Sequence, residues 1–150
     1  MSLNLEITEG KLGVRPPVAK PHPGFYDEVG EERFRELVDD HYELIRVSEI
    51  AFLFPINDEE DFIQAKKNAA DYLIEISGGP DYFKQNRGEA QIVGRHAPFR
   101  IDEYARRKWL ELYVVLLPGL LDEGITEEYV QSFWDYLNIH SMWMINTPSA

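Results

Sequence analysis

The sequence predicts an all-α fold. Apolar residues recur at intervals of three or four positions in four separate stretches, which is the spacing that places side chains on one face of a helix. No stretch alternates apolar and polar residues as a half-buried strand would, and no internal repeat is present. With 150 residues, 44% of them hydrophobic, the chain is long enough to form one core. We therefore expect a single helical domain with one functional site.

The chain begins with a segment that is predicted to be an extended arm, residues 1–24, and the folded domain is predicted to span residues 25–150. Four prolines and little periodicity within the arm disfavour a helix there. The clearest amphipathic helix then runs from residue 31 to residue 45. Its inward stripe consists of Phe34, Leu37, Val38, His41, Tyr42 and Ile45.

A second helix is predicted over residues 58–77. Amide and acidic side chains at 57–60 supply N-terminal capping groups, and the Gly-Gly-Pro sequence at 78–80 ends the helix. The inward stripe contains Ala65 and Ala69, whose small side chains leave room for a bulky group against this helix.

The C-terminal half is predicted to contain two further helices after an irregular region. Glycines and a proline interrupt residues 81–99, so we expect a structured loop with short helical turns there. Helices are predicted over residues 101–117 and 126–145, and the Pro-Gly sequence at 118–119 separates them.

The composition excludes several kinds of site and partner. The absence of cysteine excludes disulfides, thiolate metal sites and covalent cofactor attachment through a Cys-x-x-Cys-His motif, so any metal must use histidine or oxygen ligands. The formal charge of -12 disfavours nucleic acid and anionic membranes as partners. Because no apolar run is long enough to span a bilayer and no signal-like segment is seen, we expect a cytoplasmic protein.

The four histidines are the candidate metal ligands. His22 lies between prolines and is expected to be solvated, whereas His41 and His140 lie on apolar stripes and are expected to be core histidines bonded to a neighbour. His96 differs because it lies in the irregular region between two helices, within Gly-Arg-His-Ala-Pro-Phe-Arg at 94–100. A neutral imidazole there can give its Nε2 to iron while Nδ1–H bonds a nearby carbonyl.

The surroundings of His96 are basic although the whole chain is acidic. Between residues 81 and 109 the basic residues are Lys84, Arg87, Arg95, Arg100, Arg106, Arg107 and Lys108, and the acidic ones are Asp81, Glu89, Asp102 and Glu103. This local reversal of charge suits an anionic group such as a haem propionate, which guanidinium groups pair with bidentately. A solvated basic face explains the same residues equally well.

A set of motifs, taken in order, resembles the truncated haemoglobins, and most closely the second, tryptophan-containing group. The motifs are Phe-Tyr-Asp-Glu-Val-Gly at 25–30, Asp-His-Tyr at 40–42, Gly-Gly-Pro at 78–80, Arg-His-Ala-Pro-Phe-Arg-Ile at 95–101 and Trp-Leu at 109–110. The resemblance spans about residues 25–145, and the ordered set is far more specific than any one motif. It implies a globin-like two-over-two helical sandwich enclosing haem b.

The resemblance also implies roles for individual residues. His96 matches the proximal iron ligand, and Trp109 matches the distal-side tryptophan. Tyr42 matches the tyrosine whose hydroxyl points at bound ligand, and Phe54 matches the aromatic residue packed on the haem. Ala65 lies where other globins often place a distal histidine, so the resemblance leaves Tyr42 and Trp109 as the distal hydrogen-bond donors.

The rest of the expected haem-binding wall is carried over with two departures from the group's pattern. The remaining expected cofactor-binding residues are Ala69, Tyr72, Phe83, Arg95, Arg100, Ile101 and Met144. Residues 55–64 form a longer segment than the group usually has, and Asn68, with Lys67 beside it, replaces a basic residue often found near the propionates.

Reversible binding of oxygen or another diatomic ligand, such as NO or CO, is the function that the resemblance implies. Two distal donors would also promote peroxidase-like or NO dioxygenase chemistry, for which an electron-donating reductase would be a partner. A third interpretation is a haem-free helical interaction module that binds a protein or an anion through His96 and the basic segment. The sequence does not choose among oxygen storage, transport, sensing and detoxification, and it does not give the oligomeric state.

Overall fold

The longest helix begins where the proline-rich arm ends. In the computed structural model, which describes residues 3–149, α1 (Pro23–Arg46) has a proline in its first turn, and the His22 ring accepts a hydrogen bond from the Gly24 N–H as a cap. His22 is exposed, as expected, but its role as a cap was not predicted. Gly30 has a φ of 78°, which glycine adopts without strain, and the helix kinks there.

The remaining elements are helical, and residues 3–149 contain no strand, so the all-α prediction is confirmed. They are η1 (Ala51–Leu53), α2 (Glu59–Ile76), α3 (Tyr82–Arg87), α4 (Ile92–His96), α5 (Glu103–Leu116), α6 (Pro118–Asp122), α7 (Glu127–His140) and η2 (Ser141–Met144). The Pro-Gly sequence at 118–119 starts α6, because proline fits the first turn of a helix. Within this described range, no helix is both long and apolar enough to cross a membrane.

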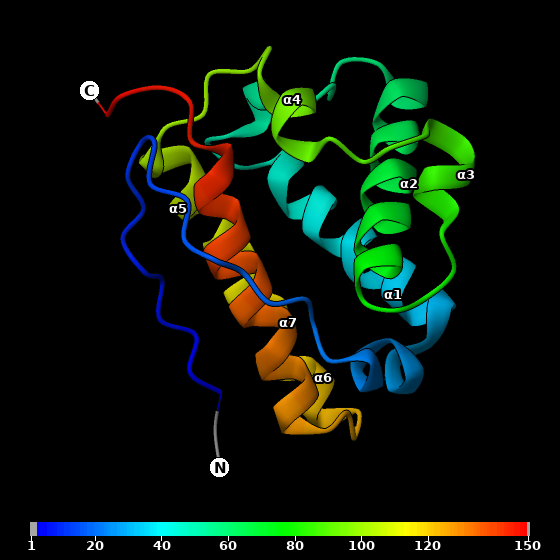
Figure 1. Cartoon of the computed structure of the whole chain (residues 1–150). Helices are drawn as coiled ribbons and strands as arrows, with labels where there is room; N and C mark the ends of the chain where they lie inside the picture. Colours follow the sequence, from blue (N-terminus) through cyan, green and yellow to red (C-terminus); the bar gives the residue numbers. More distant parts are fainter. Residues whose placement is uncertain (1–2, 150) are drawn as a thin grey trace.

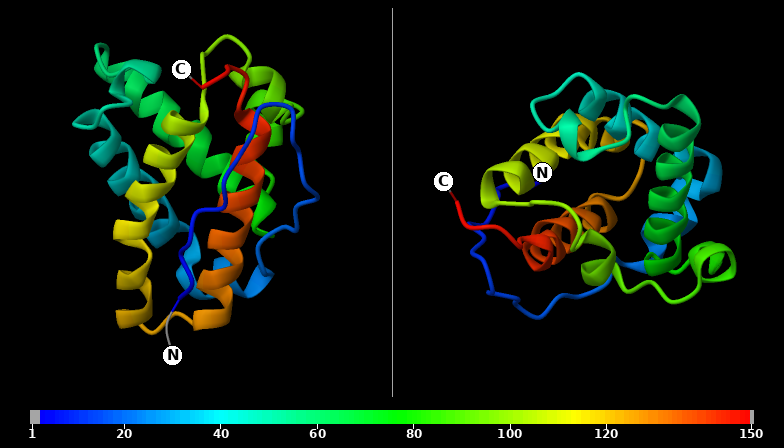
Figure 2. Two further views of the ribbon diagram at one scale, coloured as in Figure 1. Left: turned by 90° about the vertical axis from the view of Figure 1, so that its left-hand side faces the viewer. Right: turned by 90° about the horizontal axis from the view of Figure 1, so that it is seen from above.

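The helices are arranged as two pairs, which is the two-over-two architecture. α1 packs against α2, and α5 and α7 lie side by side and are joined through α6 (Figures 1 and 2). α1 also contacts α5 and α7, so it connects the two pairs. Their shared core is aromatic: Phe25 stacks on Phe133 at 4.5 Å between ring centroids, and Phe34 meets Phe133 edge-on at 5.7 Å.

A buried carboxylate ties α1, α2 and α3 together. Asp71 is fully buried and accepts hydrogen bonds from Arg35 at 2.8 Å, Lys67 at 3.0 Å and Asn86 at 3.1 Å. Burial raises the pKa of this carboxyl, but the three donors together outweigh burial and hold its pKa below the usual value. Lys67 is therefore engaged in an ion pair with Asp71.

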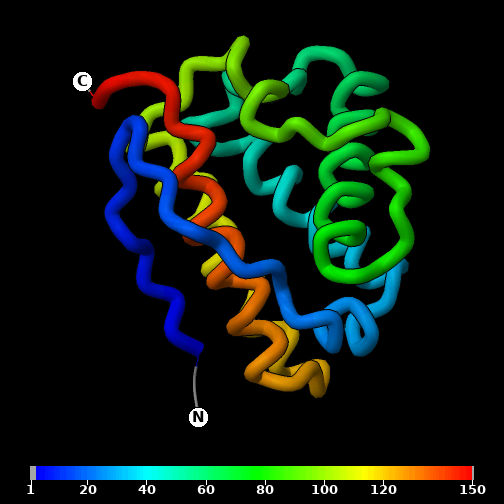
Figure 3. Tube along the Cα trace, in the orientation of Figure 1, coloured from blue at the N-terminus to red at the C-terminus, as the bar shows by residue number. Residues whose placement is uncertain are grey.

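The N-terminal arm runs along α7 and η2 (Figure 3). Asn138 accepts from the Thr8 N–H at 3.0 Å, and Arg106, which is 3% exposed, donates to the Thr8 carbonyl at 2.8 Å and to Glu103 at 2.9 Å. The Gly10 N–H also donates to Glu103, at 2.9 Å. The arm thus covers a buried ion pair and satisfies its polar atoms.

Substitution of Gly10 by valine is expected to lift the arm from this contact. A Cβ at Gly10 would lie only 2.8 Å from Glu103 Oε1 and 2.9 Å from Ile145 Cδ1, so the side chains or the arm must move. We expect the free energy of unfolding, measured with urea, to fall by about 1–3 kcal/mol. Gly119→Ala is the matched control, because nothing lies within 4 Å of its Cβ position. Equal stability of the two variants would contradict a close fit at Gly10.

Candidate functional site

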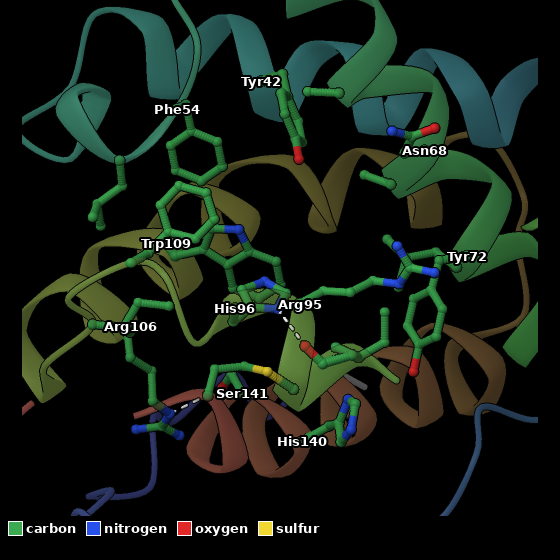
Figure 4. Close-up of a pocket in the computed structure, with 18 of the residues that line it drawn as sticks. Tyr42, Phe54, Asn68, Tyr72, Arg95, His96, Arg106, Trp109, His140 and Ser141 are labelled. Carbon is green, nitrogen blue, oxygen red and sulfur yellow. Dashed lines mark hydrogen bonds between the residues drawn. The ribbon is translucent and has the colours of Figure 1, made fainter. Parts of the chain in front are cut away.

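A cavity of about 600 Å³ lies between the helix pairs, and its wall is mostly apolar (Figure 4). The wall includes all of the predicted site residues except Arg100. These are Tyr42, Phe54, Ala65, Ala69, Tyr72, Phe83, Arg95, His96, Ile101, Trp109 and Met144. The cavity therefore gathers side chains from α1, α2, α3, α4, α5 and η2 that are far apart in the sequence.

Arg100 does not reach the cavity. It is exposed, in the connection that follows α4 and leads to the start of α5 at Glu103. The chain crosses the surface here, so adjacent side chains cannot all face inward, and Ile101 takes the inward position instead. The expectation that Arg100 contacts a cofactor in this cavity is not supported.

His96 lies at the end of α4 with one ring nitrogen fixed. Its Nδ1 is 2.8 Å from the Ile92 carbonyl, one helical turn earlier. Because a carbonyl can only accept, Nδ1 carries the proton, and in the neutral ring Nε2 is left with a free lone pair. Residues 3–149 contain no group of three His, Asp or Glu side chains that could hold a bare metal ion. A single imidazole does suit haem iron, since the porphyrin nitrogens would supply the other ligands.

Two hydrogen-bond donors face the cavity from other helices. The Tyr42 hydroxyl points into it from α1, and Trp109 lines it from α5 (Figure 4). Burial raises the pKa of Tyr42, so its hydroxyl stays protonated and can donate. Phe54 meets the Tyr42 ring edge-on, with 5.4 Å between centroids, and this contact limits the rotation of the Tyr42 ring.

The part of the wall contributed by α2 includes two small side chains. Ala65 and Ala69 line the cavity one turn apart. The prediction that small residues on α2 accommodate a bulky group therefore agrees with the position of the cavity.

The arginines near the cavity are mostly bound to the protein itself. Arg95 donates to the carbonyls of Ala90 at 2.7 Å and Arg87 at 2.9 Å, and its guanidinium lies over the Phe83 ring. Arg106 is held by the arm contacts described above. Arg87 and Asn68 also line the cavity, and Arg87 is exposed, which makes it the freer cation at the opening. Only the local excess of positive charge indicated Arg87 in the sequence.

A hydrogen-bonded chain in the wall joins Tyr72, which was predicted as a site residue, to Tyr136 and His140, which were not. The Tyr72 hydroxyl is 2.6 Å from the Tyr136 hydroxyl, which is 2.8 Å from His140 Nδ1. His140 is thus a histidine bonded to a neighbour, as expected, but it also lines the cavity. Burial, assisted by His96, lowers the pKa of His140 and keeps its ring neutral. The four-residue spacing of Tyr136 and His140 was the sequence signal for this pair.

Comparison with known proteins gives a consistent result. The model of the bacterial-like globin family matches residues 24–146. Group 2 truncated hemoglobin YjbI of Bacillus subtilis (strain 168) is 27% identical over 125 residues, which cover 83% of this chain and 90% of that protein. Two-on-two hemoglobin-3 of Arabidopsis thaliana is 29% identical over 89 residues, and the chain spans 49% of its length.

Solved structures show the same fold. The phosphate-bound Hell's gate globin IV structure is 34% identical, with a TM-score of 0.82 over 97% of this chain and 89% of that one. A thermostable hemoglobin from Thermobifida fusca is 29% identical, with a TM-score of 0.73 over 83% of this chain and 98% of that one. The family match spans nearly all of the helical part, including every element that lines the cavity. The chain therefore belongs to the bacterial-like globin family, and its similarity within that family is to the group 2 truncated haemoglobins.

Proposed function

We propose that the cavity binds haem b, with His96 as the iron ligand and with Tyr42 and Trp109 as donors to a diatomic ligand such as oxygen. Globins bind oxygen and related ligands through haem, and membership of the family supports this general function for the chain. The observation that carries the finer proposal is that one apolar cavity contains an imidazole with a free Nε2 and two separate hydrogen-bond donors.

The residues present fit a non-covalently bound haem. The chain contains no cysteine to form a thioether bond, and the cavity wall is apolar apart from a few polar groups. Haem supplies an iron centre that binds diatomic molecules. Reversible oxygen binding requires ferrous iron, so an electron-donating reductase is the partner that this function needs.

The protein's own side chains would hold the haem, orient the bound ligand and exclude water. The Nδ1–H bond to the Ile92 carbonyl fixes the His96 ring and makes Nε2 a better donor of electron density. Phe54, Trp109 and the alanines of α2 keep water from the cavity, which strengthens any hydrogen bond from Tyr42 or Trp109. These two donors favour a bound ligand that carries partial negative charge.

Absorption spectra of the purified protein in ferric, dithionite-reduced and oxygenated forms test the proposal. We expect a Soret band that shifts on reduction and again on exposure to oxygen. A protein with only aromatic absorbance, unchanged after haemin is added, would contradict haem binding and favour a helical interaction module. Peroxide and NO consumption assays would then separate ligand binding from redox catalysis in the haem-loaded protein.

Removal of either distal donor is expected to accelerate oxygen release. We expect Tyr42→Phe and Trp109→Phe each to increase the dissociation rate about tenfold, because a hydrogen bond in a dry pocket contributes about 1–3 kcal/mol. Stopped-flow displacement of oxygen by CO measures this rate. Tyr104→Phe is the matched control, since Tyr104 is 52% exposed and does not line the cavity. Unchanged release in both distal variants would contradict their roles as donors.

A further inference from the structure

We infer that His41 is a positioning residue that sets the geometry of the two distal donors, an inference that rests on the proposed haem-binding function. His41 precedes Tyr42 on α1, and its ring contacts Trp109 on α5. It is fully buried and is not among the described residues that line the cavity. It therefore acts on a ligand only through Tyr42 and Trp109.

The ring of His41 holds both the backbone and the side chain of Trp109. His41 Nε2 is 3.0 Å from the Trp109 carbonyl oxygen, so Nε2 carries the proton and donates it. The ring also stands edge-on to the indole, with 5.0 Å between centroids and 90° between planes. It stacks on Tyr113, one turn further along α5, at 3.7 Å and 21°. A carbonyl inside a helix already accepts from the residue four positions later, so α5 does not need this bond in order to form.

The other nitrogen of the ring shows that packing alone does not explain a histidine here. His41 Nδ1 is buried and finds no hydrogen-bond partner in the described part of the chain. An unsatisfied buried acceptor is costly, and a phenylalanine ring would fill the same space without this cost. What the imidazole offers and a phenyl ring does not is the Nε2–H donor to Trp109.

As a consequence, the positions of the two donors, Tyr42 and Trp109, are fixed relative to each other. Tyr42 and His41 share one turn of α1, so the His41 bond to Trp109 joins the two helices at the level where both donors enter the cavity. Hydrogen bonds weaken steeply with poor distance or angle. A small shift of α5 relative to α1 therefore weakens the hydrogen bond from Trp109 to a bound ligand without abolishing it.

Two substitutions of His41 in the haem-loaded protein test this role. We expect His41→Phe to accelerate oxygen dissociation about fivefold to tenfold, which is the effect of a partly lost hydrogen bond. His41→Gln is expected to restore the rate to within about twofold of the wild type, because its amide N–H₂ can donate to the same carbonyl. CO, a less polar ligand when bound, should be released at a rate that changes less in both variants. If both variants accelerate oxygen release equally, or if neither does, the positioning role is wrong.

A measurement on haem-free protein separates this inference from the proposed function. In ¹⁵N-labelled protein, we expect the Trp109 indole N–H resonance to move in His41→Phe and to return in His41→Gln, and the wild-type His41 ring to be protonated at Nε2. An unmoved indole resonance, or a proton at Nδ1, would overturn the role of His41 even if haem binds. A wild-type protein without a Soret band would contradict the proposed function, while the resonance test of the His41–Trp109 bond would still be valid.

Discussion

Replacement of His96 by alanine is expected to abolish stable haem retention while leaving the helical fold in place. His96 is partly exposed, and its side chain bonds only its own helix, through Nδ1 and the Ile92 carbonyl, so its loss removes little of the core. It does remove the imidazole nitrogen that we propose as the iron ligand. Since changes in groups that only support a metal ligand cost about 10–100-fold in affinity, loss of the ligand itself should exceed about 100-fold. Haemin transfer to an apoglobin acceptor measures the loss rate.

Two controls make the His96 experiment specific. His96→Gly leaves a space that free imidazole can enter, so added imidazole should restore the Soret band in that variant. His140→Phe should retain haem, because the Tyr136 hydroxyl can donate to His140 Nδ1, and Nε2 then carries the ring proton and has no lone pair for iron. Full haem retention in His96→Ala combined with loss in His140→Phe would show that the two histidines had been assigned the wrong way round.

The helices were predictable because their signals are local. The stripe from Phe34 to Ile45 and the cap at Asp58 act within a few residues, and they lie in α1 and at the start of α2, although α1 begins at Pro23 and not at the predicted residue 31. The short helices α3 and α4 were foreseen only as turns in a structured loop, because five or six residues are stabilised by tertiary packing and not by propensity. The course of the arm was not predictable, since it depends on contacts such as Thr8 with Asn138, 130 residues apart.

Within the site, residue type was predictable but the partners of charged groups were not. His96, Tyr42 and Trp109 line one cavity, as the ordered motifs indicated. The basic segment gave no indication that Arg95 binds backbone carbonyls or that Arg106 is buried under the arm. A guanidinium can pair with a carbonyl, a carboxylate or a ligand at similar sequence positions, and only the three-dimensional structure distinguishes these cases.

The acid stability of the protein is expected to depend strongly on His41. Burial lowers the pKa of His41 from its ordinary value of 6.5 to about 3, and the bond to the Trp109 carbonyl only partly offsets burial. Between pH 6.5 and 3 the unfolded chain binds a proton at this ring that the folded chain does not. This contribution to stability is therefore complete above pH 6.5 and is lost as the pH falls towards 3, at about 1.4 kcal/mol per pH unit.

His41→Phe should remove this pH dependence. Near pH 7 its free energy of unfolding should lie within about 1.5 kcal/mol of the wild type, because a lost hydrogen bond is offset by the removal of the unsatisfied Nδ1. By pH 4.5 the Phe variant should have gained about 3 kcal/mol relative to the wild type. Urea unfolding at several pH values measures the difference, to which the carboxylates contribute equally in both proteins. His41→Gln keeps a donor but does not titrate. Its free energy of unfolding should therefore change with pH in the same way as that of His41→Phe below pH 6.5. Parallel curves for all three proteins would mean that the folded imidazole takes up its proton at an ordinary pH, which is incompatible with a ring sealed between Trp109 and Tyr113.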